Sequence, residues 1–315
     1  MEKIRLGISA CLLGENVRYD GGHSHDRFLT DTLGRYFEYI PVCPEVEFGF
    51  PVPREAIRLE GDPVSPRLMK TLTREDITDS MNKWARMRIS MLENESLCGF
   101  IFKSRSPSCG IERVKVHGGK GQPVKKGTGL FARSFMEQFP LIPVEDDGRL
   151  NDPGLRENFI ERVFVLNRWR DLLKEKESRG RLTDFHTRHK MLILSHSTAH
   201  YQLSGRLIAS AKMLPIKEVY QQYHSLLMES LRLTATPKKH SNVLMHMVGY
   251  FKKDLTPDEK QELLEVIDNY RTGHIPLIVP VTLIKHYVRK YDQPYLREQV
   301  YLRPHPLELQ LRNHV

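Results

Sequence analysis

Hydrophobic positions in the first half of the chain recur in two alternating patterns. Short apolar runs bounded by Gly or Pro are typical of strands, and longer stretches with apolar residues three and four apart are typical of helices. The predicted strands cover residues 3–10, 39–43, 97–103 and 111–117, and the predicted helices cover residues 27–37, 75–94 and 129–138. This alternation predicts a Rossmann-like α/β domain with a mostly parallel sheet.

From about residue 150 onward the pattern is helical. Apolar residues recur at helical spacing within residues 159–173, 189–211, 219–233, 243–251 and 263–267. Thr256 is a predicted N-cap, because Pro257 and two acidic residues follow it. The polar, turn-rich segment 145–154 separates the halves, so we predict an α/β domain over residues 1–148 and an all-α domain over residues 149–315.

Three cysteines occupy equivalent positions in the first domain. Cys11, Cys43 and Cys109 each follow a strand-like run and are followed closely by Gly or Pro. Neighbouring parallel strands present their carboxyl ends at one edge of the sheet, where open α/β sheets bind ligands. We therefore expect the three thiols to share one crevice. Cys98 lies inside an apolar run and is predicted to be a small buried hydrophobe.

Three thiolates in one crevice form a metal site with a vacant position. They can hold a four-iron four-sulfur cluster with one iron free of protein ligands, or a zinc ion that takes His23 or His25 as its fourth ligand. The compact Cys-x₂₋₄-Cys spacing of structural zinc sites is absent. Spacing alone leaves iron–sulfur, zinc and unliganded thiols open.

The residues around two of these thiols suggest chemistry rather than a structural role. Glu45 follows a Cys-Pro turn and would place its carboxylate in the crevice, where it can move protons or orient water. The loop before Cys109 carries Ser104, Arg105 and Ser108. A crevice with a metal, a carboxylate, hydroxyls and an arginine is typical of a reaction site.

The charge is unevenly distributed. Of 48 Lys and Arg and 39 Asp and Glu, residues 1–150 hold 22 and 21, which leaves 26 and 18 in the remainder. A basic domain beside a neutral one favours a polyanionic partner, because cations neutralise phosphates without reading sequence. The expected RNA contacts interleave cations with aromatics and include Lys238, Lys239, Lys252 and Lys253.

Two further motifs have weaker interpretations. His196 and His200 are four apart on a predicted helix, and we expect helix packing or RNA contact rather than a shared metal. The Gly-rich run 118–129 lacks the order of a P-loop and predicts a flexible basic hairpin or lid that contacts a nucleic acid backbone.

The bulk properties favour a cytoplasmic enzyme. No apolar run approaches the roughly 20 residues of a membrane helix, and the N-terminus lacks the pattern of a signal peptide. Four cysteines in 315 residues predict reduced thiols rather than a disulfide framework.

Several motifs of the first domain resemble those of the thiouracil desulfurase family. They arrive in the family's order and cover residues 9–14, 16–21, 43–45, 49–54 and 103–110. The helical remainder resembles the YbgA-type domain found fused to such desulfurases. The two-domain arrangement is similar to that of bacterial tRNA 4-thiouridine desulfidases.

The resemblance implies a four-iron four-sulfur cluster on Cys11, Cys43 and Cys109 whose fourth iron takes the sulfur of a thiolated pyrimidine. It also implies an acid–base role for Glu45 with help from a serine, for which Ser104 is preferred over Ser108. The implied reaction converts 4-thiouridine in tRNA to uridine with release of sulfide and without net electron transfer. The alternatives are desulfuration of free thiouracil and a non-catalytic, zinc-stabilised RNA-binding adaptor.

Overall fold

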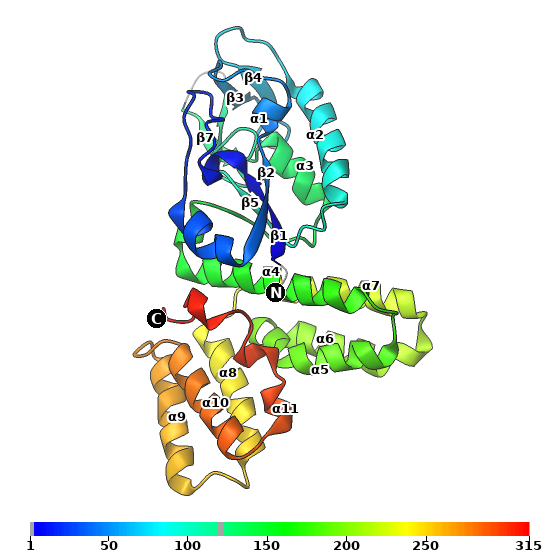
Figure 1. Cartoon of the computed structure of the whole chain (residues 1–315), viewed down its shortest axis with the longest axis vertical. Helices are drawn as coiled ribbons and strands as arrows, with labels where there is room; N and C mark the ends of the chain where they lie inside the picture. Colours follow the sequence, from blue (N-terminus) through cyan, green and yellow to red (C-terminus); the bar gives the residue numbers. More distant parts are fainter. Residues whose placement is uncertain (1–2, 119–121, 315) are drawn as a thin grey trace. The chain divides into compact units, whose positions relative to one another are not determined.

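The computed structural model describes residues 3–118 and 122–314 and divides the chain into two compact units, up to Asp152 and from Pro153 onward (Figure 1). The division falls after Asp152 rather than after Gly148, where the sequence pattern placed it. The reason is local: residues Arg149–Asn151 form a short 3₁₀ helix, and the Arg149 side chain pairs with Glu145 at 2.5 Å. This turn therefore remains with the first unit.

The first unit contains a parallel sheet, as the alternating pattern predicts. Its strand order is β2-β1-β5-β8, and every neighbouring pair is parallel. The strands are β1 (Ile4–Ser9), β2 (Phe37–Val42), β5 (Phe100–Phe102) and β8 (Val144–Asp146). The carboxyl ends of the first three therefore lie at one edge of the sheet, and their following loops carry the three cysteines.

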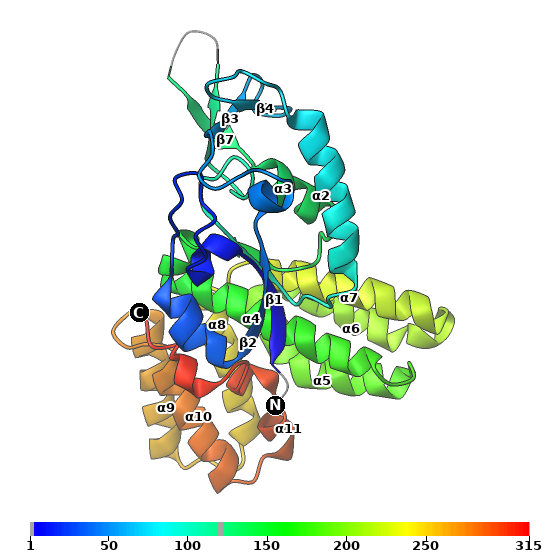
Figure 2. The same cartoon turned by 45° about the horizontal axis from the view of Figure 1, so that its top comes forward.

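A second, mixed sheet has the order β4-β3-β6-β7. Its strands are β3 (Ile57–Glu60), β4 (Arg67–Lys70), β6 (Val114–His117) and β7 (Val124–Gly127), and β3, β4 and β7 lie together at one end of the unit (Figure 2). The predicted strand 111–117 therefore belongs to this sheet. It pairs antiparallel with β7, so the Gly-rich run forms the expected hairpin, whose residues 119–121 lie outside the described residues.

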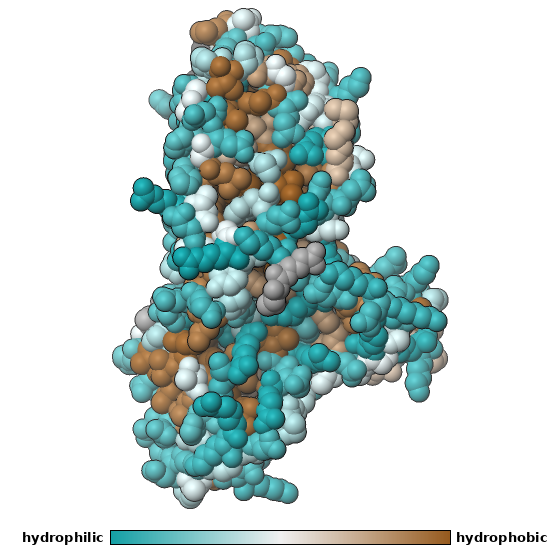
Figure 3. Space-filling model, viewed as in Figure 1, coloured by the Kyte–Doolittle hydropathy of each residue, from teal (hydrophilic) through white to brown (hydrophobic). Residues whose placement is uncertain are grey.

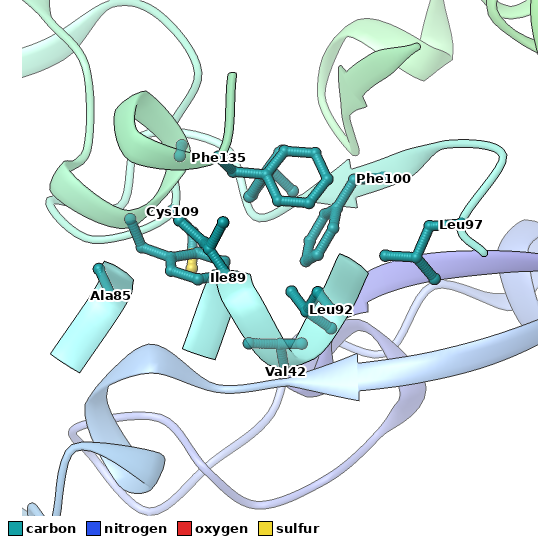
Figure 4. Packing of buried hydrophobic residues seen from close by; sticks show 11 residues of the cluster. Val42, Ala85, Ile89, Leu92, Leu97, Phe100, Cys109 and Phe135 are labelled. Atoms are coloured by element: carbon teal, nitrogen blue, oxygen red, sulfur yellow. The ribbon is translucent and has the colours of Figure 1, made fainter. Parts of the chain in front are cut away.

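The core of the first unit packs two helices against the parallel sheet. These are α2 (Thr78–Glu93) and α3 (Leu130–Gln138), and α1 (Pro44–Glu47) is a single short turn after β2. Side chains from the helices and strands point toward one another in Figure 4, where Phe100 and Phe135 stack edge to face with centroids 4.8 Å apart. Cys109 is part of this buried cluster, so the core fixes the loop that carries it.

The second unit is helical, as its periodicity predicts. Its α-helices are α4 (Pro153–Leu173), α5 (Arg179–His196), α6 (Thr198–Ala209), α7 (Ile216–Arg232), α8 (Pro237–Val248), α9 (Pro257–Arg271), α10 (Ile278–Lys290) and α11 (Pro294–Arg297). Thr256 caps α9 through a capping box with Glu259, so the predicted N-cap is confirmed.

Local chemistry explains where the elements differ from the predicted ones. The helix expected over 27–37 is a π turn followed by a 3₁₀ turn, Phe28–Thr32 and Leu33–Arg35. The helix expected over 189–211 is broken at Ser197, whose extended backbone ends α5 and whose side chain accepts a hydrogen bond from His200 N. Helix α10 was not predicted, because Pro280 lies inside it, in the first turn where proline is tolerated.

Figure 3 shows hydrophilic side chains over most of the face in view, with scattered apolar patches. Within the described ranges, every helix is too short or too polar to cross a bilayer.

Candidate active site

The three thiols line one cavity of about 360 Å³ at the carboxyl edge of the parallel sheet. Cys11 lies in a 3₁₀ turn (Ala10–Leu13) directly after β1, and Cys43 is the N-cap residue of α1 directly after β2. Cys109 lies in the loop between β5 and β6. Three segments distant in sequence therefore meet because parallel strands present equivalent ends at one edge.

Two glycines let the Cys109 loop fold closely on itself. A Cβ at Gly129 would lie 2.5 Å from the carbonyl carbon of Ser108, and a Cβ at Gly110 would lie 2.9 Å from the carbonyl oxygen of Ser106. Both distances are too short for any side chain. The backbone N–H of Gly129 donates to the carbonyl of Gly110 at 2.8 Å, which joins the loop to the start of α3.

Glu45 lies at the centre of a buried polar cluster in this cavity. Its Oε2 accepts hydrogen bonds from Arg54 Nε at 2.9 Å and Nη2 at 2.7 Å, and its Oε1 accepts one from Ser108 Oγ at 2.8 Å. The side chains of Arg54 and Glu45 are 5% and 14% exposed. A guanidinium that donates twice to one oxygen fixes the carboxylate and leaves the other oxygen directed at Ser108.

A line of hydroxyls continues from Glu45. Because Ser108 donates to the carboxylate, the 2.9 Å contact between Ser106 Oγ and Ser108 Oγ is donated by Ser106. Ser106 Oγ accepts in turn from the backbone N–H groups of Ser108 and Cys109, at 3.3 Å and 3.1 Å. The order Ser106 to Ser108 to Glu45 is suited to moving a proton toward or from the carboxylate.

Ser104 lines the same cavity but belongs to a different cluster. Its backbone N–H donates to Asp147 at 2.6 Å, and its hydroxyl lies 3.3 Å from the ammonium of Lys103. Lys103 pairs with Asp147 at 2.5 Å, and its backbone N–H donates to Ser9 Oγ at 2.9 Å. The geometry therefore separates the two predicted serines: Ser108 contacts Glu45, whereas Ser104 lies beside a lysine.

Burial controls the protonation of the three thiols. It raises the pKa of Cys11 to about 11, even though Lys103 and Arg18 act in the opposite direction. Burial also raises the pKa of Cys43 and that of Cys109, and the nearby acid Glu45 adds to both effects. Uncharged thiols are therefore favoured at neutral pH, and a bound cation is needed to stabilise the thiolates.

The donor set fits a polynuclear cluster better than a single ion. In residues 3–118 and 122–314, no three His, Cys, Asp or Glu side chains converge closely enough to hold one metal ion. His23 and His25, the proposed fourth zinc ligands, are not among the residues that line the cavity, and the His25 ring contacts Thr30 at 3.1 Å. Cys98 is buried and does not line it either.

The candidate RNA-binding lysines of the second unit have different surroundings. Lys238, Lys252 and Lys253 are exposed. Lys239 is half-buried, and its ammonium donates to the carbonyls of His196 and Thr234 at 2.8 Å and 2.9 Å. That contact ties α8 to the end of α5, so Lys239 serves the fold.

The two histidines considered as a pair do not form a metal site. His196 closes α5 and His200 lies in α6, so they do not share one helix. His196 Nε2 lies 2.6 Å from Glu161, and His200 Nε2 lies 3.9 Å from Glu229. The structure supports the helix-packing interpretation for His196.

Sequence reasoning assigned no role to three residues that shape the cavity. Arg54 fixes Glu45 and also donates to the carbonyl of Val17 at 2.8 Å. Arg18 and Lys103 also line the cavity and favour ionisation of Cys11. Arg54 lies inside one of the matching motifs, so its position there was a usable signal.

The fold and the cavity define a class of protein: an α/β unit with three thiols at the sheet edge, followed by a helical unit. Residues 6–147 match the 2-thiouracil desulfurase family model, and residues 190–306 match the model for a protein of unknown function called DUF1722.

Two similar proteins accompany these matches. The uncharacterized protein YbgA of Escherichia coli K12 is 35% identical over 153 residues, which are 48% of this chain and 90% of YbgA. A solved structure of TudS, described as a 4Fe-4S-dependent thiouracil desulfidase, is 26% identical and superposes with a TM-score of 0.39 over 48% of this chain and 95% of its own. The chain belongs to the YbgA family and also carries a 2-thiouracil desulfurase domain, as its motifs predicted.

Proposed function

We propose that this protein removes sulfur from 4-thiouridine in tRNA, with water as the oxygen source and sulfide as the second product. The observation that carries the proposal is that three thiols and the Glu45–Ser108 pair line the same cavity. The family model over residues 6–147 supports desulfuration of a thiolated pyrimidine. The reaction exchanges a thiocarbonyl sulfur for a water oxygen, both protons of water leave with the sulfide, and no electrons are transferred.

Cys11, Cys43 and Cys109 would hold a four-iron four-sulfur cluster. The cavity offers three thiols without a fourth cysteine, and among the described residues no group of ligands is compact enough for a single ion. When bound, such a cluster supplies an iron position without a protein ligand, which is a Lewis acid for a soft sulfur donor. Because the pKa of each thiol is raised, loading releases protons.

Glu45 and Ser108 would handle the protons. Arg54 holds the carboxylate in place, and the hydroxyl of Ser108 lies between Glu45 Oε1 and Ser106. A carboxylate in this position can accept a proton from an attacking water and return it to the leaving sulfur. Ser108 is therefore a better candidate than Ser104, which contacts Lys103 and Asp147.

The proposed domain roles follow the same division. Residues 1–148 would form the iron–sulfur desulfurase domain, and the basic helical remainder would hold tRNA, with Lys238, Lys252 and Lys253 exposed to contact it. A tRNA substrate places the reaction in the cytoplasm. The competing function is desulfuration of free thiouracil, which the 2-thiouracil desulfurase match favours.

Sulfide release by the anaerobically reconstituted full chain tests the proposal. Thiolated tRNA and free 4-thiouracil are supplied separately, and the wild type is compared with Cys11→Ala, Cys43→Ala and Cys109→Ala. We expect each variant to lose activity on both substrates, with Cys98→Ala as the matched control that keeps it.

Full activity in any of the three variants would show that the substituted cysteine is not a cluster ligand. Turnover of free base without turnover of tRNA would favour the thiouracil alternative. Protein that binds about one zinc and stays colourless after reconstitution would favour the adaptor.

A further inference from the structure

A second cavity of about 510 Å³ lies in the first unit, beside the site described above. We call it the hairpin groove. Its basic lining residues come from β3, β6, β7 and the loops next to them, and they are Arg58, Arg105, Arg113, Lys115, His117 and Lys125. None of its lining residues in the described part of the chain is acidic.

The hairpin groove and the catalytic cavity share part of their lining. Ile57, Arg105 and Pro107 line both. Pro107 and Arg105 belong to the loop that carries Ser108 and Cys109, so the loop that supplies catalytic groups on one side supplies a cation on the other. The cations of the hairpin groove therefore lie next to the catalytic cavity.

The two strands of the hairpin place like charges against each other. Lys115 of β6 and Lys125 of β7 are directly opposed in the antiparallel register, and both are exposed. Like charges in this arrangement destabilise a sheet. Across residues 3–118 and 122–314, neither lysine has a carboxylate within ion-pair distance. The fold therefore keeps an unfavourable pair that a bound anion would neutralise.

The remaining cations of the groove differ in whether a nearby carboxylate compensates their charge. Arg58 pairs with Glu60 at 2.6 Å, so its charge is compensated. Arg113 makes only a long 3.7 Å contact with Glu112 and its side chain is 80% exposed. Burial lowers the pKa of His117, and Arg58 and Lys115 lower it further against the opposing effect of Glu60, so His117 is not counted among the available charges. The available charge comes from Arg105, Arg113, Lys115 and Lys125.

We infer that the hairpin groove binds backbone phosphates of the RNA that flank the nucleotide whose base enters the catalytic cavity. This inference rests on the proposed function and narrows it, because a free base has no phosphates to place there. A nucleotide of a polymer carries phosphates on both sides, and a base reaches an enclosed site only when the chain leaves its stack. Lysines and arginines beside that entrance would hold the backbone through charge.

The test is the double variant Lys115→Ala/Lys125→Ala in the reconstituted full chain. Its matched control is Lys83→Ala/Arg86→Ala, which removes two exposed cations from α2 of the same unit and lines neither cavity. We expect the ratio of kcat/KM for thiolated tRNA to kcat/KM for free 4-thiouracil to fall about tenfold in the groove variant and less than twofold in the control.

Binding to unmodified tRNA is measured in parallel over a range of salt concentrations. Each lost phosphate contact should reduce the slope of log K against log salt by about 0.7 to 0.9, so the groove variant should lose about 1.5. An unchanged slope, or an equal change in the control, would overturn the inference.

The two measurements also separate this inference from the proposed function. If the wild-type protein releases no sulfide from thiolated tRNA but the groove variant has a reduced salt slope, the tRNA reaction is refuted. Phosphate binding by the hairpin groove is then still supported. If the wild type and the groove variant both turn over thiolated tRNA efficiently and have equal salt slopes, only phosphate binding by the hairpin groove is refuted.

Discussion

Two carboxylates with little exposure, one in each unit, are held by arginine in similar ways but have different neighbours. Glu45 pairs with Arg54 at 2.7 Å and accepts from Ser108. Glu161 lies 2.6 Å from His196 and 3.3 Å from Arg312, and all three side chains are 2–3% exposed. Both carboxylates also line a cavity.

The two carboxylates differ in whether the groups around them already have all their bonding partners. Arg312 donates to Glu157 at 3.0 Å, to Glu161 and to the carbonyl of Tyr301 at 2.7 Å, so the helical network satisfies itself. Glu45 instead shares its cavity with three thiols, which need a cation to ionise. An ion pair alone does not mark a reaction site; neighbours with unfilled bonding capacity do.

The largest expected effect is on catalysis. Glu45→Gln keeps the shape of the side chain but removes its charge, and loss of a positioned acid or base typically costs about 10²- to 10⁴-fold in rate. We expect that decrease in kcat for sulfide release, with the same iron content. Ser104→Ala is the control and should lower kcat far less than Ser108→Ala; equal losses would contradict the separation of the two serines.

The corresponding change in the helical unit should act on stability. Arg312→Met leaves Glu157 and Glu161 buried without their cation, and breaking a buried pair typically costs about 3 to 5 kcal/mol. Urea unfolding followed through Trp169, in a Trp84→Phe background, measures it, because the chain has two tryptophans and Trp169 belongs to the helical unit.

The control for this change is Arg297→Met, which breaks the pair with Asp292. Arg297 and Asp292 are 53% and 80% exposed, so a cost of about 0 to 1 kcal/mol is expected. Equal costs for the buried and the exposed pair would show that the Glu161 network does not stabilise the unit.

The two units should also differ in how their stability changes as the pH falls. Burial lowers the pKa of several histidines in the helical unit, to about 4 for His186 and His224 and about 3 for His189 and His240, and it acts in the same direction on His305. In an unfolded chain they titrate near about 6.5, so the stability present above that pH is lost as the pH falls toward the folded values. Burial opposes ionisation of Glu161, but its bonds to His196 and Arg312 lower its pKa to about 2, so its contribution disappears between about 4.5 and 2.

Hydrogen bonds from Arg74 and Thr78 lower the pKa of Glu60 and Asp76 in the first unit, so these carboxylates also lose stabilisation in acid. We expect the first unit to lose less, because burial raises the pKa of Glu145 and of Asp146. Their protonation favours the folded state as the pH falls. We expect the Trp169 signal of the Trp84→Phe variant to report unfolding at a higher pH than the Trp84 signal of the Trp169→Phe variant. The reverse order would contradict this assignment.

The smallest expected effect concerns a helix end. Thr256→Ala removes the capping box of α9, and such losses typically cost about 1 kcal/mol. Thr183→Ala is a control with a different expectation, since Thr183 bonds back to the carbonyl of Arg179 within α5 and alanine is a better helix former. A cost at Thr183 equal to that at Thr256 would refute the capping argument.

The parts of this fold that depend on periodicity and strand polarity were predictable from sequence. The position of Cys11, Cys43 and Cys109 at one sheet edge follows from parallel strands alone. The different contacts of Ser104 and Ser108 were not predictable, because they depend on how the loop after β5 folds against Glu45 and Asp147.

Contacts between elements could not be predicted from the sequence either. The register that opposes Lys115 and Lys125 requires knowing that β7 exists, and its sequence Val-Lys-Lys-Gly has little strand character. The ion pair of Arg54 with Glu45 joins the loop before β3 to α1, and no periodic pattern in the sequence encodes that contact.

The raised pKa of each of the three thiols has a consequence for their reactivity. Oxidants and alkylating agents attack the thiolate, and thiols whose ionisation is suppressed react slowly. Slow reaction of these thiols limits sulfenic acid formation and mispaired disulfides. The side chains proposed to hold the cluster thereby remain as thiols.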